Sequence, residues 1–136
     1  MPAPSSFDYA IVRVVPRVER GEQMNAGVIV HCHERGYLAA RIELDRARLV
    51  ALDPDVDMPL VERHLAAITR ICEGGAGAGP IGRLPRKERW SWLIAPRSTI
   101  IQMSRAHVGL CEAPESAIER LMDKLVRACG AGRGQA

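Results

Sequence analysis

Residues 9–30 read YAIVRVVPRVERGEQMNAGVIV, and this stretch sets the pattern of the fold. Apolar side chains occupy both faces of residues 9–15 and again of residues 26–32, which predicts two β-strands in the interior of a sheet. Pro16 ends the first strand because it cannot donate a hydrogen bond to a neighbouring strand. Arg13 is the one charged residue in that strand, and it serves either to pair with a carboxylate or as a positioned cation facing a ligand.

The polar turn between the two strands holds Glu22 and Asn25, and Gly27 follows at the entrance of the second strand. An asparagine at such a place can fix a turn by bonding to its own backbone. A glycine permits another backbone or a ligand to approach closely. The pattern is therefore compatible both with a purely structural turn and with a polar binding site.

The following residues predict a third strand and two helices. Residues 37–44 alternate between apolar and polar side chains, which indicates a strand with one solvated face. Asp45 can cap a short helix that ends at Leu52, and Asp57 can cap the first long helix. That helix carries an apolar stripe at helical spacing, formed by Val61, Leu65, Ile68 and Cys72.

The second half of the chain is less regular, although Trp90, Trp92 and Ile94 alternate as the side chains on one face of a strand do. A second long helix with an apolar stripe closes the chain. In order, the predicted segments are a Gly-rich loop (73–85), a fourth strand (87–95), a fifth strand (99–104), an irregular segment (105–113) and the last helix (114–129).

The resulting order is β-β-β-α-β-β-α, and short connectors between neighbouring strands favour antiparallel pairing. We therefore predict an α+β fold, in which a five-stranded, mainly antiparallel sheet has one apolar face covered by two long helices. The 136 residues suit a single domain, ordered over about 7–129 and frayed at both ends.

The composition points to a cytoplasmic protein. The net charge is only +3, the four cysteines are widely spaced without a C-x-x-C pair, and no apolar run is long enough for a membrane span. No N-terminal stretch has the features of a secretion signal. We expect free thiols and no membrane association.

Catalytic motifs are weak. Residues 77–82 match G-x-G-x-x-G, but a helix precedes and a strand follows, the reverse of what dinucleotide binding requires. His31 and His33 share one face of their strand while Cys32 points away, so we predict no metal site. No G-x-S-x-G element is present. We expect no cofactor, name no catalytic residue and favour a protein that is not an enzyme.

A basic segment between Arg83 and Arg105 has six cations and one anion, Glu88, a net charge of +5. It is either a solvated rim or a face that receives an anionic ligand or an acidic partner. Trp90 and Trp92 lie in the same segment, and aromatic side chains beside cations can stack bases, anchor a protein interface or fill the core.

The stretch of residues from Tyr9 onward, with Glu22, Asn25, Gly27 and Val28 as E-x-x-N-x-G-V, resembles the bacterial family named domain of unknown function 3037. The segments GYLAARIEL (36–44), PIGRLP (80–85) and WLIAPRSTII (92–101) fit the same resemblance, which covers residues 7–126. It implies a small stand-alone cytoplasmic domain with no assigned reaction. It also implies a partner or accessory role beside a kinase-like protein encoded nearby.

Three hypotheses about function follow. The first is a non-enzymatic binding module for a protein partner. The second is a small enzyme or a nucleotide- or anion-binding protein, with Glu22 as acid or base and Arg97 as anion clamp, which requires the two connectors to meet. The third is nucleic-acid binding through the basic segment 83–105. The candidate binding residues are Arg13, Glu22, Asn25, Gly27, Trp92, Arg97 and Ser98.

Overall fold

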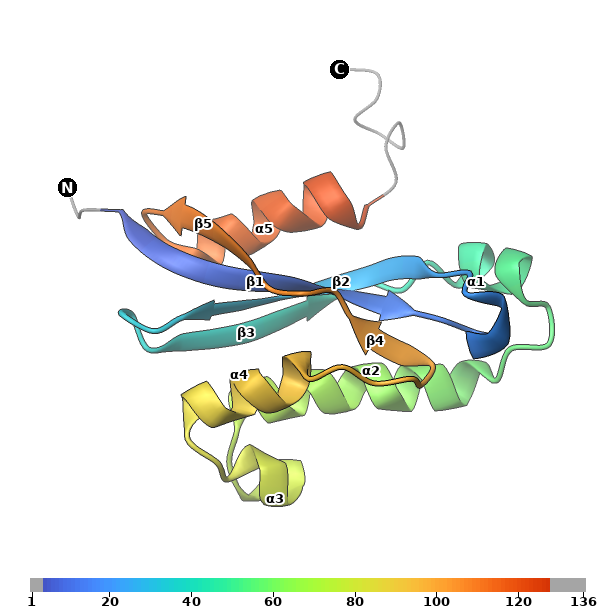
Figure 1. The fold of residues 1–136 in the computed structure, drawn as a ribbon, viewed down its shortest axis with the longest axis horizontal. Coiled ribbons are helices and arrows are strands. Elements are labelled where there is room, and N and C mark those ends of the chain that lie inside the picture. Colours follow the sequence, from blue (N-terminus) through green and yellow to red (C-terminus); the bar gives the residue numbers. More distant parts are fainter. Residues whose placement is uncertain (1–3, 128–136) are drawn as a thin grey trace.

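A central strand, β1, organises the sheet, because it pairs with three of the four other strands in the part of the chain that is described. The computed structural model describes residues 4–127. The predicted fraying up to residue 6 is wrong for Ser5 and Ser6, which belong to β1, and the predicted fraying after residue 129 lies outside the described residues. The α+β prediction is confirmed: an open antiparallel sheet of five strands is packed against helices within these residues (Figure 1). The elements are β1 (Ser5–Val14), η1 (Val18–Arg20), β2 (Met24–Cys32), β3 (Tyr37–Ile42), α1 (Arg46–Leu52), α2 (Met58–Glu73), η2 (Ala76–Ala78), α3 (Gly79–Gly82), α4 (Arg86–Ile94), β4 (Ile101–Met103), β5 (His107–Cys111) and α5 (Pro114–Leu125).

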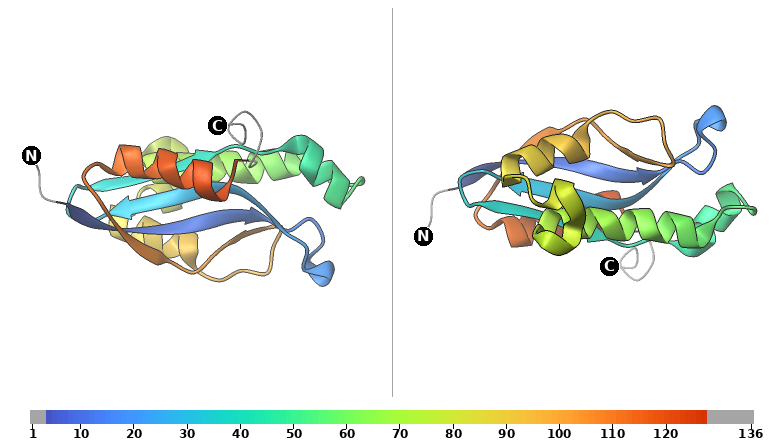
Figure 2. Two further views of the ribbon diagram at one scale, coloured as in Figure 1. Left: turned by 90° about the horizontal axis from the view of Figure 1, so that it is seen from above. Right: turned by 90° about the horizontal axis from the view of Figure 1, so that it is seen from below.

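One side of β1 pairs with β2, which pairs in turn with β3. The other side of β1 is shared, since β5 pairs with its first half and β4 with its last residues. All these pairings are antiparallel. Strands β4 and β5 thus act as one interrupted strand along the same side of β1 (Figure 2).

A bulge joins β4 to β5. Three residues, 104–106, lie between the two strands, opposite only Ala10 and Ile11 of β1. Ser104 continues the hydrogen bonding to β1 at this point. Its backbone N–H donates to Ile11 O (2.9 Å), and its buried hydroxyl accepts a hydrogen bond from Ile11 N (2.8 Å). The side chain therefore replaces a backbone carbonyl, and the sheet continues across the irregularity.

Helices cover both faces of the sheet. Helices α2 and α4 lie on one face and α5 lies on the other (Figure 1). Two separate cores result, one containing Val12, Ile29 and Leu65 and the other containing Val28, Val30 and Ile118. Our expectation that both long helices cover one apolar face is therefore wrong in this detail. The helices on both faces explain why both faces of β1 and β2 carry apolar side chains.

The predicted helix starts are confirmed by their caps. The Asp45 carboxylate accepts a hydrogen bond from Arg48 N at the start of α1, and the Asp57 carboxylate accepts one from Leu60 N at the start of α2, each at 3.1 Å. The apolar stripe predicted for α2 is buried as expected. Each fully buried side chain of this kind contributes about 1.5–3 kcal/mol to folding.

Three segments differ from the prediction. Residues 87–94 of the predicted fourth strand (87–95) belong to helix α4, because Trp90 and Leu93 share the buried side of a helix while Trp92 faces outward. Residues 107–111 form β5 and are not irregular. The Gly-rich segment contains the short helices η2 and α3. Within residues 4–127, no helix is both long and apolar enough to cross a membrane.

Candidate functional site

Helix α4 separates the two tryptophans of the chain. Trp90 is buried, 6% exposed, with its ring stacked on the imidazole of His31 at a centroid distance of 5.4 Å. Trp92 is 39% exposed on the other side of the helix. Residues two apart point in nearly opposite directions on a helix, so only Trp92 is available to a ligand or partner.

Arg97 lies over the exposed tryptophan. Its guanidinium carbon is 4.1 Å from the centre of the Trp92 ring, a cation–π arrangement. The same guanidinium donates hydrogen bonds to Leu93 O (3.1 Å) and to Trp92 O, two carbonyls at the end of α4. Arg97 thus caps the helix C-terminus, where a positive charge is favourable, and holds the tryptophan side chain in place.

A small pocket adjoins this pair and is named here the Trp92–Arg97 pocket. Its volume is about 120 Å³. It lies between α2, α4, β4 and the connector before β4, and most of its walls are apolar. The lining residues are His64, Ala67, Ile68, Ile71, Trp92, Leu93, Arg97, Thr99, Ile101 and Met103. Pockets for nucleotides and other small molecules measure about 300–1,000 Å³, so this one suits a single side chain better.

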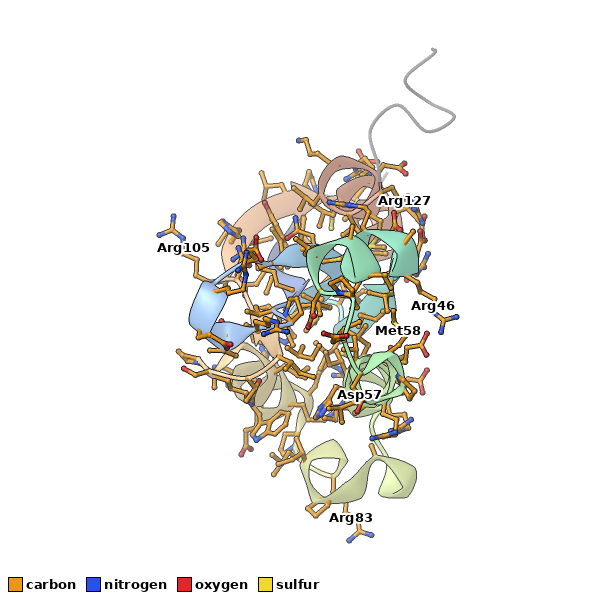
Figure 3. All side chains as sticks on the ribbon, turned by 90° about the vertical axis from the view of Figure 1, so that its right-hand side faces the viewer. Arg46, Asp57, Met58, Arg83, Arg105 and Arg127 are labelled. Atoms are coloured by element: carbon orange, nitrogen blue, oxygen red, sulfur yellow. The ribbon has the colours of Figure 1, made fainter. Side chains whose placement is uncertain are left out.

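The other cations of the basic segment do not gather around this pocket. Figure 3 shows Arg83 and Arg105 well apart, the former directly after α3 and the latter in the β4–β5 bulge. Arg89 is buried, 8% exposed. Its guanidinium donates to Ile71 O (2.8 Å), Cys72 O (2.7 Å) and Leu84 O (2.9 Å), so it joins the end of α2 to the start of α4. Arg83, Arg89 and Arg105 therefore do not share one basic face.

Asn25 and Gly27 have structural contacts. Asn25 belongs to β2, and its amide donates to Leu125 O (2.9 Å) at the end of α5 instead of to its own turn. A Cβ atom on Gly27 would lie 2.6 Å from Arg41 O of the neighbouring strand β3. The close approach that we predicted for this glycine is thus made by a backbone of the same sheet.

Glu22 and Arg13 lie apart from the pocket as well. Glu22 is paired with Arg20 at 2.8 Å, and this hydrogen bond, together with the charge of Arg20, lowers the pKa of the carboxyl group below its ordinary value. Arg13 lies opposite Asn25 and Gln102, and its buried Nε has no hydrogen-bond partner among the described residues.

The candidate residues therefore separate into two groups. Trp92 and Arg97 are brought together on the α2–α4 face, with the exposed Ser98 beside them in sequence. Asn25 contacts α5 on the opposite face. Asn25 and Arg97 thus bond to helices on opposite faces of the sheet, and a shared polar site of Glu22 and Arg97 stays a prediction.

The sequence did not reveal that three polar residues are buried in the fold: His31, Arg89 and Ser104. His31 is 4% exposed, and both of its ring nitrogens lack a hydrogen-bond partner within the described residues. Burial lowers the pKa of this histidine, against the attraction of Asp8 on the adjacent strand. No local pattern marks such a residue, because its burial depends on the packing of α4 over β2.

Other sites offer less chemistry. A larger hollow of about 450 Å³ at the start of α5 is lined by Leu110, Cys111 and Arg120 among others. In the described part of the chain, no three histidine, cysteine, aspartate or glutamate side chains are placed to hold a metal ion. Burial raises the pKa of the Cys72 thiol to about 12, so this cysteine is a poor nucleophile.

Comparison with known proteins agrees with the resemblance in sequence. No curated protein matches the chain, and no solved structure matches it either. A model of a family described as "Protein of unknown function (DUF3037)" matches residues 9–126, which is most of the chain and includes the residues that line the Trp92–Arg97 pocket and all of the sheet except the first residues of β1. The chain belongs to the DUF3037 family.

Proposed function

We propose that this protein is a non-enzymatic binding module, and that its Trp92–Arg97 pocket receives one apolar side chain of a protein partner. The observation that carries the proposal is the exposed Trp92 ring, 39% exposed and held under Arg97, at the rim of an apolar pocket of about 120 Å³. Tryptophan and arginine are the residues most enriched among those that dominate binding energy at protein interfaces.

The polar groups at the rim of the pocket indicate which residues of a partner would fit there. Two hydrogen bonds hold Arg97 to the end of α4, and a guanidinium group has five N–H donors, so donors remain for a further acceptor. The exposed His64 lies on the same rim. An apolar residue followed or preceded by aspartate or glutamate would fill the pocket and pair with these groups.

The alternative of a small enzyme or nucleotide-binding protein at Glu22, Asn25 and Arg97 receives less support. Asn25 is bonded to α5 on one side of the sheet, whereas Arg97 is bonded to α4 on the other. Nucleic-acid binding through the basic segment is likewise less supported, because one of its cations is buried and two others are far apart.

Selection of peptides from a random phage-displayed library with the full chain tests the proposal. We expect the enriched peptides to share an apolar residue next to an acidic one. Trp92→Ala should weaken their binding by roughly 30-fold, the effect of losing about 2 kcal/mol at a dominant interface residue. Val50→Ala, which alters another exposed apolar side chain (44% exposed, on α1), is the matched control and should bind as the unaltered protein does.

The kinase-like protein suggested by the family resemblance is the first full-length partner to test, by co-purification and titration calorimetry. Failure to enrich any peptide, together with failure to bind that protein, would contradict the proposal. So would equal binding by the unaltered protein and Trp92→Ala, because the pocket would then have no part in recognition.

A further inference from the structure

Strand β5 is an outer strand of the sheet without the usual protection of such strands. Its sequence, His107–Cys111, contains neither a charged residue nor proline. Val108 and Leu110 are each 71% exposed, the most exposed of the large apolar side chains in the described residues. Outer strands in soluble proteins are normally blunted by charges, prolines or covering elements, because their free backbone groups pair readily with another strand.

The hydrogen-bonding pattern shows which backbone groups of β5 are free. Both backbone groups of Ile11 bond to Ser104, and Val15 N donates to Ile100 O, so the odd-numbered residues of β1 point toward the β4–β5 side. In an antiparallel ladder this direction alternates along each strand. His107, Gly109 and Cys111, which lie opposite odd-numbered residues of β1, therefore bond to β1, and the N–H and C=O groups of Val108 and Leu110 point away from the sheet.

We propose that β5 pairs with β5 of a second copy of this chain, in an antiparallel arrangement about a two-fold axis at Gly109. This register places Val108 opposite the partner's Leu110, and the free backbone groups of both residues then bond to each other. Because the axis repeats the contact, four backbone hydrogen bonds form and the exposed apolar side chains cover one another. The two sheets become one.

The charges at the two ends of β5 fit this arrangement. Arg105 precedes the strand and Glu112 follows it, and both are exposed. Arg105 extends away from the fold in Figure 3. Neither side chain has an ion-pair partner within residues 4–127. With the axis at Gly109, Arg105 lies opposite the partner's Ala113, one position from the partner's Glu112, so each end of the strand pair brings a positive and a negative charge close together.

The contact is small, so we expect a weak dimer with a dissociation constant on the order of micromolar. It shares no residue with the lining of the Trp92–Arg97 pocket, so either proposal can fail without the other.

Sedimentation velocity of the full chain over a range of concentrations tests the dimer. The unaltered protein should change from monomer to dimer as its concentration rises. Leu110→Lys places like charges near the axis and should raise the dissociation constant at least about tenfold, whereas Val50→Lys, the matched change on α1, should leave it unaltered. Circular dichroism verifies that each variant is folded.

A charge exchange tests the antiparallel arrangement. Arg105→Glu and Glu112→Arg should each weaken the dimer, because each brings like charges close together at both ends of the strand pair. The double variant should restore it, since the pairs are then opposite in charge again. A protein that stays monomeric up to roughly 1 mM overturns the proposal and leaves β5 for a strand of another protein. A dimer that is insensitive to Leu110→Lys or to the charge exchange also overturns it, because the contact then lies elsewhere.

Discussion

Replacement of Arg89 by methionine tests how the α2–α4 face is held together. Arg89 is 8% exposed, and its guanidinium donates three hydrogen bonds of 2.7–2.9 Å to the carbonyls of Ile71, Cys72 and Leu84. Methionine has a similar length and no charge, so Arg89→Met removes these bonds with little change in volume. The carbonyls at the end of α2 then lose their only side-chain donor among the described residues.

The size of the effect follows from these contacts. A hydrogen bond to a charged group contributes about 1.5–3 kcal/mol, so three of them amount to at least about 4.5 kcal/mol. Burying a charge has its own cost, which methionine avoids, and we allow about 1.5 kcal/mol for this difference. The free energy of unfolding should therefore fall by about 3 kcal/mol, a large part of the 5–15 kcal/mol that is typical of a domain.

Urea denaturation, monitored by tryptophan fluorescence, measures this change. With a denaturant dependence of about 2 kcal/mol per molar, the midpoint should fall by about 1.5 M. Lys87→Met, a change at an exposed cation of the same helix, is the control and should shift the free energy by less than about 0.5 kcal/mol. Arg89→Lys should lie between the two, because one ammonium group cannot reach three carbonyls in the geometry of the guanidinium fork. A loss below about 1 kcal/mol for Arg89→Met would refute this reasoning.

Two further changes test the sheet. Burial lowers the pKa of His31 in the folded chain, so below about pH 6.5 the unfolded chain binds a proton that the folded chain does not. The free energy of unfolding should therefore decrease as the pH falls, by up to about 1.4 kcal/mol per pH unit between the two pKa values. His31→Leu should reduce this dependence on pH in urea titrations from pH 7 to 5. Gly27→Ala would place a Cβ atom 2.6 Å from Arg41 O and should lower the free energy of unfolding by about 1–3 kcal/mol. In the control Gly77→Ala, the added Cβ atom has no other atom within 4 Å, so the free energy of unfolding should stay unchanged or rise slightly. If thermal melts show equal effects of the two alanine substitutions, the contact between Gly27 and β3 is not tight.

The parts of the fold that the sequence predicts are those whose signal is local. The hairpin strands β1 and β2, the capping residues Asp45 and Asp57 and the stripe of α2 each follow from neighbours within a few residues. The family membership follows from motifs of the same kind, and it is confirmed over residues 9–126.

The parts that the sequence does not predict are decided by distant contacts. Residues 87–95 alternate as a strand would, but Arg89 can reach the end of α2 and Trp90 can cover His31 only from a helix. Strand β5 contains Gly109, which usually weakens a strand. Here a Cβ atom at that position would lie 2.6 Å from the ring of Phe7, so the glycine is required by the packing between β1 and β5. No pattern within either segment contains this information.

The candidate site divides in the same way. Trp92 and Arg97 are five residues apart, and their types alone suggested a binding role. The rest of the pocket comes from α2 and β4, and His64 joins it only through the packing of α2 beside α4. Asn25 resembled a turn residue because its partner, Leu125 O, is 100 residues away in the chain.

The distribution of exposed apolar side chains indicates where binding takes place. Helices pack on both faces of the sheet, so the sheet itself offers little free surface. Trp92 lies on α4 next to β4, and Val108 and Leu110 lie on β5, so three of the five large apolar side chains that are exposed in the described residues flank the β4–β5 side of β1. If the chain pairs through β5, the dimer carries two Trp92–Arg97 pockets related by the two-fold axis. A partner that presents two copies of the recognised peptide would then bind more tightly than one copy by up to about 10²–10⁴-fold without any new contact, which gives a weak dimer a direct effect on recognition.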